Sequence, residues 1–220
     1  MKFFIINGSP RKDGNTAQLL EKSSDGIKSI CSDAEIELVN LYDIPFNGCK
    51  SCFACKKING RHYGKCVYND DFKPILEKIV RSDGVILGSP VYFGDVSGVM
   101  RCFLERFIFP FFVYDEKMTS LAPKRMAIGC IYTMNLDEET ARQLGYQDLF
   151  DKNEMVLEKM FSKPIHIYSY DTYQFDYTKY KMELFTKEDK LKTRKTQFPI
   201  DLENAFKLGE KIAIEAKQHG

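Results

Sequence analysis

The sequence of 220 residues lacks three features that would assign it to a class of protein directly. It has no charge excess, because 32 Lys and Arg residues against 31 Asp and Glu residues leave a formal net charge of +1. No apolar stretch approaches the roughly 18 residues of a membrane-spanning helix, and no internal repeat is present. These absences argue against nucleic acid or a membrane as a partner. We expect a soluble, cytoplasmic protein.

The alternation of apolar runs with amphipathic segments predicts an α/β fold. The length and a hydrophobic content of 44% suit one sizeable core rather than two enzyme domains, so residues 1–220 are expected to form a single domain. The predicted strands are residues 2–6, 35–41, 84–87, 125–132 and 164–170. The predicted helices are residues 15–30, 70–80, 97–107, 138–161 (interrupted near Gly145) and 201–216. This alternation implies right-handed crossovers and a doubly wound, five-stranded parallel sheet with helices on both faces.

The loop from Gly8 to Thr16, between the first strand and the first helix, is the first candidate site. Backbone N–H groups and the positive end of the helix dipole converge there, which favours an anion. The side-chain donors in the loop are Ser9, Arg11, Asn15 and Thr16. Gly14 lets the backbone approach a ligand closely. Asn15 stands where a Walker A loop has Lys, and G-x-G-x-x-G is absent, so a terminal monophosphate is the expected guest. The alternative is an ordinary capped strand-to-helix turn.

A second loop, residues 88–94, follows the third predicted strand. In a doubly wound sheet of strand order 2-1-3-4-5, the carboxyl ends of strands one and three flank the topological switch point, so both loops border one crevice. The candidate residues in this loop are Pro90, Val91, Tyr92, Phe93 and Gly94. Flat apolar faces beside approachable amides suit a heteroaromatic ring with polar edges. The alternative is two aromatic side chains buried in the core beside a turn.

Together the two loops resemble those of a known family. The motifs are Gly8-Ser9-Pro10-Arg11-x-x-Gly14-Asn15-Thr16, a cysteine-rich segment ending Asp70-Asp71-Phe72, and Gly88-Ser89-Pro90-Val91-Tyr92-Phe93-Gly94-x-Val96-Ser97-Gly98. They are similar to those of the flavodoxin-like NAD(P)H-dependent FMN reductases and, within these, of the iron–sulfur flavoproteins. The resemblance covers residues 1–135 with specific motifs and the rest more weakly. It implies a flavodoxin-like sheet of order 2-1-3-4-5 and bound FMN.

The resemblance also assigns expected roles to single residues. Those expected at the FMN phosphate are Ser9, Arg11, Asn15 and Thr16, with Gly14 in the same loop. Residues 90–94 would lie along the isoalloxazine ring. Thr133, in the loop after the fourth strand, would border the ring, although the sequence around it lacks the glycine-rich form expected of the family.

Four of the seven cysteines fall in one loop, residues 43–69: Cys49, Cys52, Cys55 and Cys66. A C-x2-C-x2-C run can turn three thiolates toward one centre. By the resemblance these four would hold a [4Fe–4S] cluster, although the ten residues between Cys55 and Cys66 exceed the family's usual spacing. Reduced cysteines that only pack the loop, a zinc site and a thiol–disulfide pair are the alternatives. The scattered cysteines, expected in the core, are Cys31, Cys102 and Cys130.

Residues 172–199 interrupt the alternation and are expected to form an excursion from the fold. Within them, Lys179 to Lys195 carries seven basic and three acidic residues, an excess of +4. The excursion would pack its aromatics on the body or on a neighbouring subunit, or dock an acidic electron-transfer partner or a phosphorylated cofactor. The run Phe107 to Tyr114 is a candidate subunit contact, with core packing as the alternative. By the resemblance, we expect a homodimer or homotetramer.

The predicted function is an FMN-dependent oxidoreductase. NAD(P)H would pass a hydride to the flavin N5, and an acceptor (a quinone, a nitro or azo compound, a flavin or a ferric species) would take the electrons. No acid–base catalyst is assigned, because the cofactor performs the difficult step. The main alternative is an iron–sulfur flavoprotein that transfers electrons to a ferredoxin-like partner. A flavin-free anion-binding domain is the third hypothesis.

Overall fold

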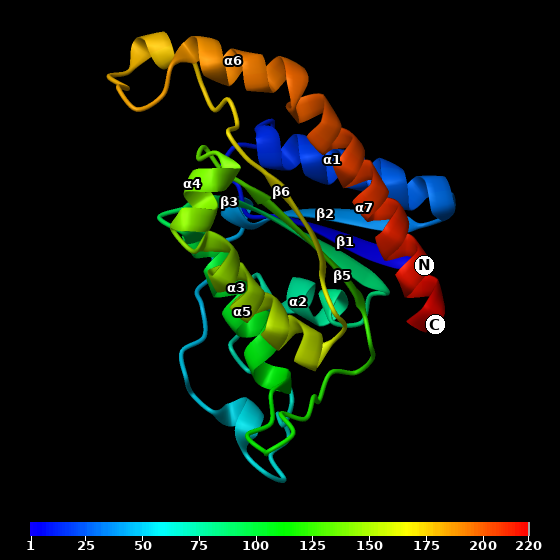
Figure 1. Cartoon of the computed structure of the whole chain (residues 1–220). Helices are drawn as coiled ribbons and strands as arrows, with labels where there is room; N and C mark the ends of the chain where they lie inside the picture. The colour runs from blue at the N-terminus through cyan, green and yellow to red at the C-terminus, as the bar shows by residue number, and fades with distance from the viewer. Residues whose placement is uncertain (220) are drawn as a thin grey trace.

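The computed structural model describes residues 1–219 and centres on one parallel sheet (Figure 1). Its strands, in spatial order, are Glu35–Asn40 (β2), Lys2–Asn7 (β1), Gly84–Tyr92 (β3), Ala127–Thr133 (β5) and Ile165–Ser169 (β6). The three central strands are buried along nearly all their length, as their continuous apolar sequences require. Counted along the chain, these five strands have the predicted order 2-1-3-4-5, and the flavodoxin-like class is confirmed.

Helices cover both faces of the sheet (Figure 1). On one face lie Asn15–Ile30 (α1) and Phe198–His219 (α7). On the other lie Lys73–Ile79 (α2), Gly98–Ile108 (α3) and Tyr146–Met160 (α5). Helices α1 and α7 approach very closely at Gly26 and Gly209, where an added Cβ would stand 2.0 Å and 1.9 Å from a carbonyl oxygen of the other helix. Only glycine permits this separation.

One predicted boundary is wrong around the third strand, and one short strand was not predicted. β3 extends to Tyr92, so the predicted loop of residues 88–94 is the end of a strand and a tight turn. The turn leads to a sixth strand, Asp95–Val96 (β4), which pairs antiparallel with β3 and was not predicted. Pro90 is tolerated there because β1 ends at Asn7, opposite Gly88, so no β1 residue needs the missing N–H of Pro90.

The C-terminal half departs from the prediction in two places. The helix predicted over 138–161 is interrupted as expected at Gly145, whose φ is +71°, which leaves two helices, Glu138–Gln143 (α4) and α5. The excursion contains a helix of its own, Lys187–Thr196 (α6). The last helix begins at Phe198 rather than at residue 201. Within residues 1–219, no helix combines the length and the apolar character needed to cross a membrane.

Candidate functional site

The ends of β1, β3 and β5 bring the two predicted loops to one crevice. A hollow of about 50 Å³ lies between them. Nine predicted residues line it: Ser9, Arg11, Gly14, Asn15, Thr16, Pro90, Val91, Tyr92 and Thr133. Phe93 and Gly94 lie outside the hollow, in the turn that follows. The hollow can take a group of a few heavy atoms but not a three-ring system.

Short hydrogen bonds hold the first loop against β3 and α3. The Gly8 N–H donates to the Gly88 carbonyl over 2.8 Å, and the Ser97 hydroxyl donates to the Gly8 carbonyl over 2.7 Å. The Ser9 N–H donates to the Asn7 side chain over 2.9 Å. These bonds leave the start of α1 directed at the hollow.

The start of α1 leaves backbone N–H groups without a side-chain acceptor. Gly14 is its N-cap and offers no side-chain acceptor to the first amides of the helix, and the first turn has no acidic residue. Unpaired amides and the positive end of the helix dipole therefore face the hollow. The hydroxyls of Thr16 and Thr133, 2.8 Å apart and both buried, join this helix to the end of β5. Thr133 thus lies at the crevice, where it was predicted, and its role as a ligand stays a prediction.

The turn after β3 presents its aromatics outward. Phe93 is fully exposed and has φ +52°, and Tyr92 is partly exposed, so neither is a core residue. Gly94 has φ +85°, and the ring of Tyr146 would stand 3.1 Å from an added Cβ, so this position needs glycine. Partial burial raises the pKa of Tyr92, which keeps its hydroxyl neutral. A flat ring could lie against this turn with one edge at the backbone.

Two residues that line the hollow were not predicted: Thr172 and Gln174. They belong to the segment 171–197, here called the strap. The Tyr173 carbonyl accepts a 2.8 Å hydrogen bond from the Asn15 side chain, and the Gln174 carbonyl accepts one of 3.1 Å from Arg11. The sequence gives little sign of this, because the contacts are made by backbone carbonyls.

Helix α6 is hydrogen-bonded to the first loop and to the start of α1. Arg194 donates to Asn15 over 2.9 Å and to Gln18 over 2.7 Å. The Arg11 guanidinium lies over the ring of Phe175, 5.7 Å from its centroid. Arg194, one of the basic residues predicted in the excursion, therefore contacts the loop from Gly8 to Thr16.

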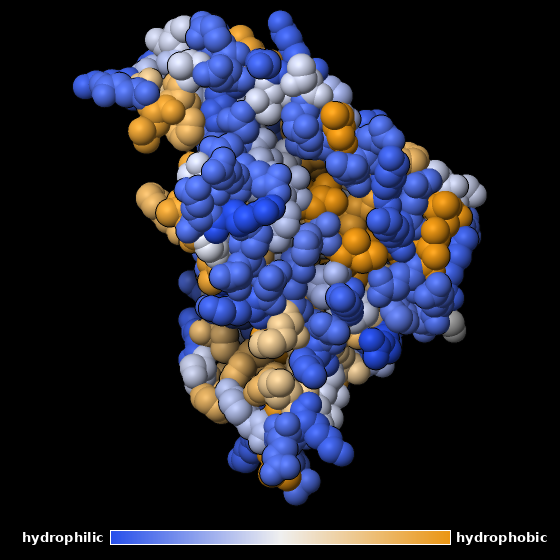
Figure 2. Space-filling view, in the orientation of Figure 1, coloured by the Kyte–Doolittle hydropathy of each residue, from blue (hydrophilic) through white to orange (hydrophobic). Residues whose placement is uncertain are grey.

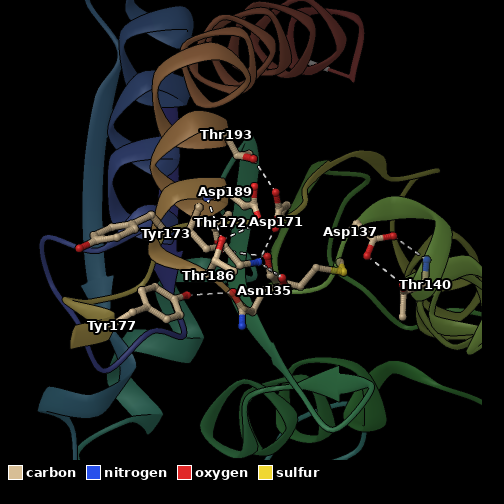
Figure 3. Close-up of polar contacts among 12 residues, drawn as sticks. Asn135, Asp137, Thr140, Asp171, Thr172, Tyr173, Tyr177, Thr186, Asp189 and Thr193 are labelled. Atoms are coloured by element: carbon tan, nitrogen blue, oxygen red, sulfur yellow. Dashed lines mark hydrogen bonds and ion pairs between the residues drawn. The ribbon is translucent and has the colours of Figure 1, made fainter. Parts of the chain in front are cut away.

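A buried polar cluster anchors the strap to the residues after β5. Lys190, only 1% exposed, pairs with the Asp171 carboxylate and donates to the Asn135 carbonyl. Thr193 also donates to Asp171, and Tyr177 donates to the Asn135 side chain over 3.0 Å, as Figure 3 shows. Asp171 has φ +52°, an uncommon conformation that this cluster stabilises. The strap is thus fixed to the crevice by buried polar contacts.

A second polar chain, also not predicted, joins β5 and β6 to α5. The Tyr132 hydroxyl donates to Glu154 over 3.0 Å, and His166 Nδ1 is 2.7 Å from the other oxygen of the same carboxylate. The hydrogen bond with Glu154 raises the pKa of His166 despite partial burial. Glu154 occupies a buried position of α5 where the helical pattern predicts an apolar residue.

The four clustered cysteines line one cavity of about 240 Å³: Cys49, Cys52, Cys55 and Cys66. Left-handed residues at Ser51 and Phe53 turn the loop around this cavity. Lys56 fixes the loop by donating to backbone carbonyls after α3, at Phe109, Pro110 and Phe112. Among the described residues, none of the seven cysteines forms a disulfide. Of the scattered three, Cys31 and Cys130 are buried as expected, whereas Cys102 is only partly buried.

The four cysteines line one space but do not form a metal site as they are placed. Within residues 1–219, no group of three His, Cys, Asp or Glu side chains lies close enough together to hold a metal ion. The metal role of Cys49, Cys52, Cys55 and Cys66 therefore stays a prediction. Burial raises the pKa of Cys55, so its thiolate requires a metal or nearby cations. Lys50 and Arg106, both on the cavity wall, supply positive charge.

The chain belongs to the NADPH-dependent FMN reductase family, whose model matches residues 1–143. An iron–sulfur flavoprotein of Methanocaldococcus jannaschii is 41% identical over 106 residues, which cover 48% of this chain and 51% of that protein. One from Archaeoglobus fulgidus is 39% identical over 106 residues, 48% of each chain. The chain thus spans about half the length of these relatives. A second M. jannaschii iron–sulfur flavoprotein matches over a longer stretch, 34% identical across 71% of this chain and 74% of its own.

Solved structures agree with the fold. An NAD(P)H:quinone oxidoreductase from Methanothermobacter marburgensis superposes with a TM-score of 0.67 at 14% identity, covering 96% of each chain. An FMN-dependent NADH-azoreductase from Bacillus anthracis, solved in complex with FMN, has a TM-score of 0.64 at 13% identity, covering 98% of this chain and 99% of that one. At these identities the likeness shows the fold alone.

Proposed function

We propose that this protein is an FMN-dependent oxidoreductase that takes hydride from NAD(P)H and reduces a small molecule or an electron carrier. The observation that carries the proposal is the crevice at the switch point, where nine residues predicted to bind FMN line one hollow. Family membership and the iron–sulfur flavoprotein relatives support the same cofactor. The quinone and azo reductases of the same fold support the acceptor class.

The crevice residues fit FMN in charge and in shape. The hollow has donors from Ser9, Arg11, Asn15 and the α1 amides and no carboxylate in its lining, so a phosphate dianion would be stabilised there. Its small volume matches a phosphate, and the exposed turn at Tyr92 and Phe93 offers a surface for the ring. When bound, FMN supplies a two-electron acceptor at N5. The protein's part is to fix the ring and leave one face open to nicotinamide.

The cysteine cavity supports a second redox group and the alternative function. Four cysteines around one space suit a [4Fe–4S] cluster, which exchanges single electrons. With a cluster, the protein could divide the two electrons of a hydride between one-electron carriers such as a ferredoxin-like partner. The expected homodimer or homotetramer also stays a proposal.

An anaerobic preparation of untagged protein tests these assignments together. We expect flavin absorption bands released by denaturation as FMN, about four irons and four sulfides per chain, and bleaching of the flavin on addition of NADH or NADPH. A colourless protein that does not bind added FMN would overturn the flavin proposal. Flavin bands without iron would overturn only the cluster. Flavin that nicotinamide does not reduce, but reduced ferredoxin does, would favour the electron-transfer function.

A further inference from the structure

The strap holds the side chain of Asn15, a proposed phosphate ligand, at both ends of its amide. The Asn15 Nδ2–H donates to the Tyr173 carbonyl over 2.8 Å, and the Asn15 Oδ1 accepts from Arg194 over 2.9 Å. A guanidinium only donates and a carbonyl only accepts, so the reversed amide would meet two groups that repel it. The strap therefore fixes the Asn15 amide in one orientation.

That orientation decides which hydrogen bond Asn15 offers to the hollow that it lines. An asparagine amide has two N–H donors and one oxygen. The oxygen is turned toward Arg194, and the Tyr173 carbonyl takes one N–H. The group left for a molecule in the hollow is the second N–H, and a donor at this place favours an anion.

Arg194 is itself held in place by two further contacts. Its second terminal nitrogen donates to the Gln18 side chain over 2.7 Å, and its guanidinium carbon lies 3.9 Å from the centroid of the Phe198 ring. Arg194 does not line the hollow, whereas Asn15 does. The guanidinium therefore acts on the hollow through the Asn15 amide and not as a ligand of its own.

Helix α6, which carries Arg194, is placed by polar contacts. Its sequence is strongly polar, and Figure 2 shows mainly hydrophilic surface at the top of the molecule, where α6 lies in Figure 1. Lys190 and Arg194 are four residues apart and so share one face of the helix. Lys190 pairs with Asp171 and donates to the Asn135 carbonyl, and Arg194 meets the start of α1. The two cations thus join α6 to the residues after β5 and to the phosphate loop.

We propose that Arg194 is a positioning residue that makes the hollow select a phosphorylated flavin over the same flavin without phosphate. By holding the Asn15 oxygen, it turns the amide nitrogen toward the phosphate as a donor. Without Arg194, the oxygen is free to turn toward the hollow, where it would repel an anion. The identity of the flavin rests on the proposed function, whereas the selection of an anion does not.

Titration of the flavin-free, full-length protein with FMN and with riboflavin tests the proposal, because the two differ only by the phosphate. Arg194→Met keeps an apolar contact with the Phe198 ring and should lower the preference for FMN about tenfold, with riboflavin affinity unchanged. Arg194→Gln serves if the Met variant does not fold. Lys195→Met, which removes an exposed charge one residue away, is the matched control and should keep the preference. Equal losses of FMN and riboflavin affinity would show a purely structural role and overturn the proposal.

A double-mutant cycle shows whether Arg194 acts through Asn15. Asn15→Ala should lower the preference for FMN about tenfold by itself, because it removes the donor. Adding Arg194→Met to Asn15→Ala should then lower the preference by less than about twofold more, since the group that Arg194 positions is already absent. Losses that multiply would mean that the Arg194 charge attracts the phosphate directly, and would overturn the positioning role.

Inorganic phosphate separates the failure of this proposal from the failure of the proposed function. If the unaltered protein binds neither flavin, the flavin proposal is refuted. Titration with phosphate, followed by the amide NMR signals of residues 8–16, then still measures the anion site. We expect phosphate to bind about tenfold more weakly to Arg194→Met than to Lys195→Met. Equal affinities in these two variants, or no phosphate binding to the unaltered protein, would overturn the inference.

Discussion

The crevice end and the cysteine end of this molecule are built by opposite means. The crevice is formed by the ends of buried parallel strands, whose register fixes where each loop begins. The cysteine cavity is formed by a loop with one short 3₁₀ turn, Ala54–Lys56, that is bent by left-handed residues and fixed by Lys56. In Figure 1 the strap stands at the top of the molecule and the cysteine loop at the bottom.

The two sites draw their stability from different parts of the structure. Strand ends continue the core, so the register of the sheet fixes the positions of the crevice residues that the strands carry. The cysteine loop has two cysteines exposed, and burial holds only Cys55 firmly. A bound cluster would cross-link this loop and supply the rigidity that regular structure supplies at the crevice. Changes at one end should therefore leave the other end intact.

Removal of a cluster ligand should have the largest effect and should be confined to the cysteine end. We expect Cys66→Ala to lose nearly all iron and to retain FMN. Cys102→Ala, which removes a cysteine outside the cavity, should keep the iron of the unaltered protein. Iron and flavin assays on the same preparations measure both. If both variants kept full iron, Cys66 would not be a ligand.

Removal of the strap anchor should affect only the crevice end. Lys190→Met leaves the Asp171 carboxylate without its partner, and we expect a loss of about 3 kcal/mol in the free energy of unfolding, with weaker FMN binding because the strap carbonyls no longer meet Asn15 and Arg11. Denaturant titration and flavin fluorescence measure the two effects. Lys192→Met, an exposed change on the same helix, is the control. Iron content should not change; a fall in iron would show that the two ends are coupled.

Much of this architecture follows from sequence patterns, for a physical reason. The apolar runs of β1, β3 and β5 can exist only in a sheet covered on both faces, and the topology of such a sheet brings the carboxyl ends of the first and third strands together. The phosphate loop and the Tyr92 turn therefore meet even though about eighty residues separate them. The predicted end of β3 was wrong because Pro90, which lacks an N–H, normally ends a strand. Here β1 ends at Asn7, opposite Gly88, so no neighbouring residue on β1 needs that N–H.

The strap could not be predicted from the same patterns. Its position depends on Lys190, Asp171 and backbone carbonyls, whereas hydrophobic periodicity detects only apolar faces. A lysine in a strongly charged helix is predicted to be exposed, and only the fold shows that Asp171 and the Asn135 carbonyl surround it. The same limit applies to Glu154, whose partners Tyr132 and His166 come from two strands.

Loss of the Arg11 guanidinium, which we propose to bind the FMN phosphate, should have a moderate effect that is confined to the crevice end. Arg11→Met should weaken FMN binding by about 2 kcal/mol, a factor of about thirty, because a charge-assisted hydrogen bond to phosphate is lost. Lys12→Met, which removes the neighbouring charge that pairs with Asp43 and does not line the hollow, should change binding little. Equal losses in the two variants would indicate general electrostatic attraction instead of a built phosphate site.

The smallest effect should come from the polar chain that joins β5 and β6 to α5. Because Glu154 raises the pKa of His166 above that of the unfolded chain, the protonated imidazole stabilises the fold below the ordinary value near 6.5, and this contribution disappears as pH rises through the higher folded value. His166→Gln should therefore cost stability at pH 5.5, by less than about 1 kcal/mol because the ring is partly exposed, and less at pH 8.5. Denaturant titrations at both pH values measure the difference. A cost that is equal at the two pH values would assign His166 a packing role, and the crevice end would then depend on the strap and the strand ends alone.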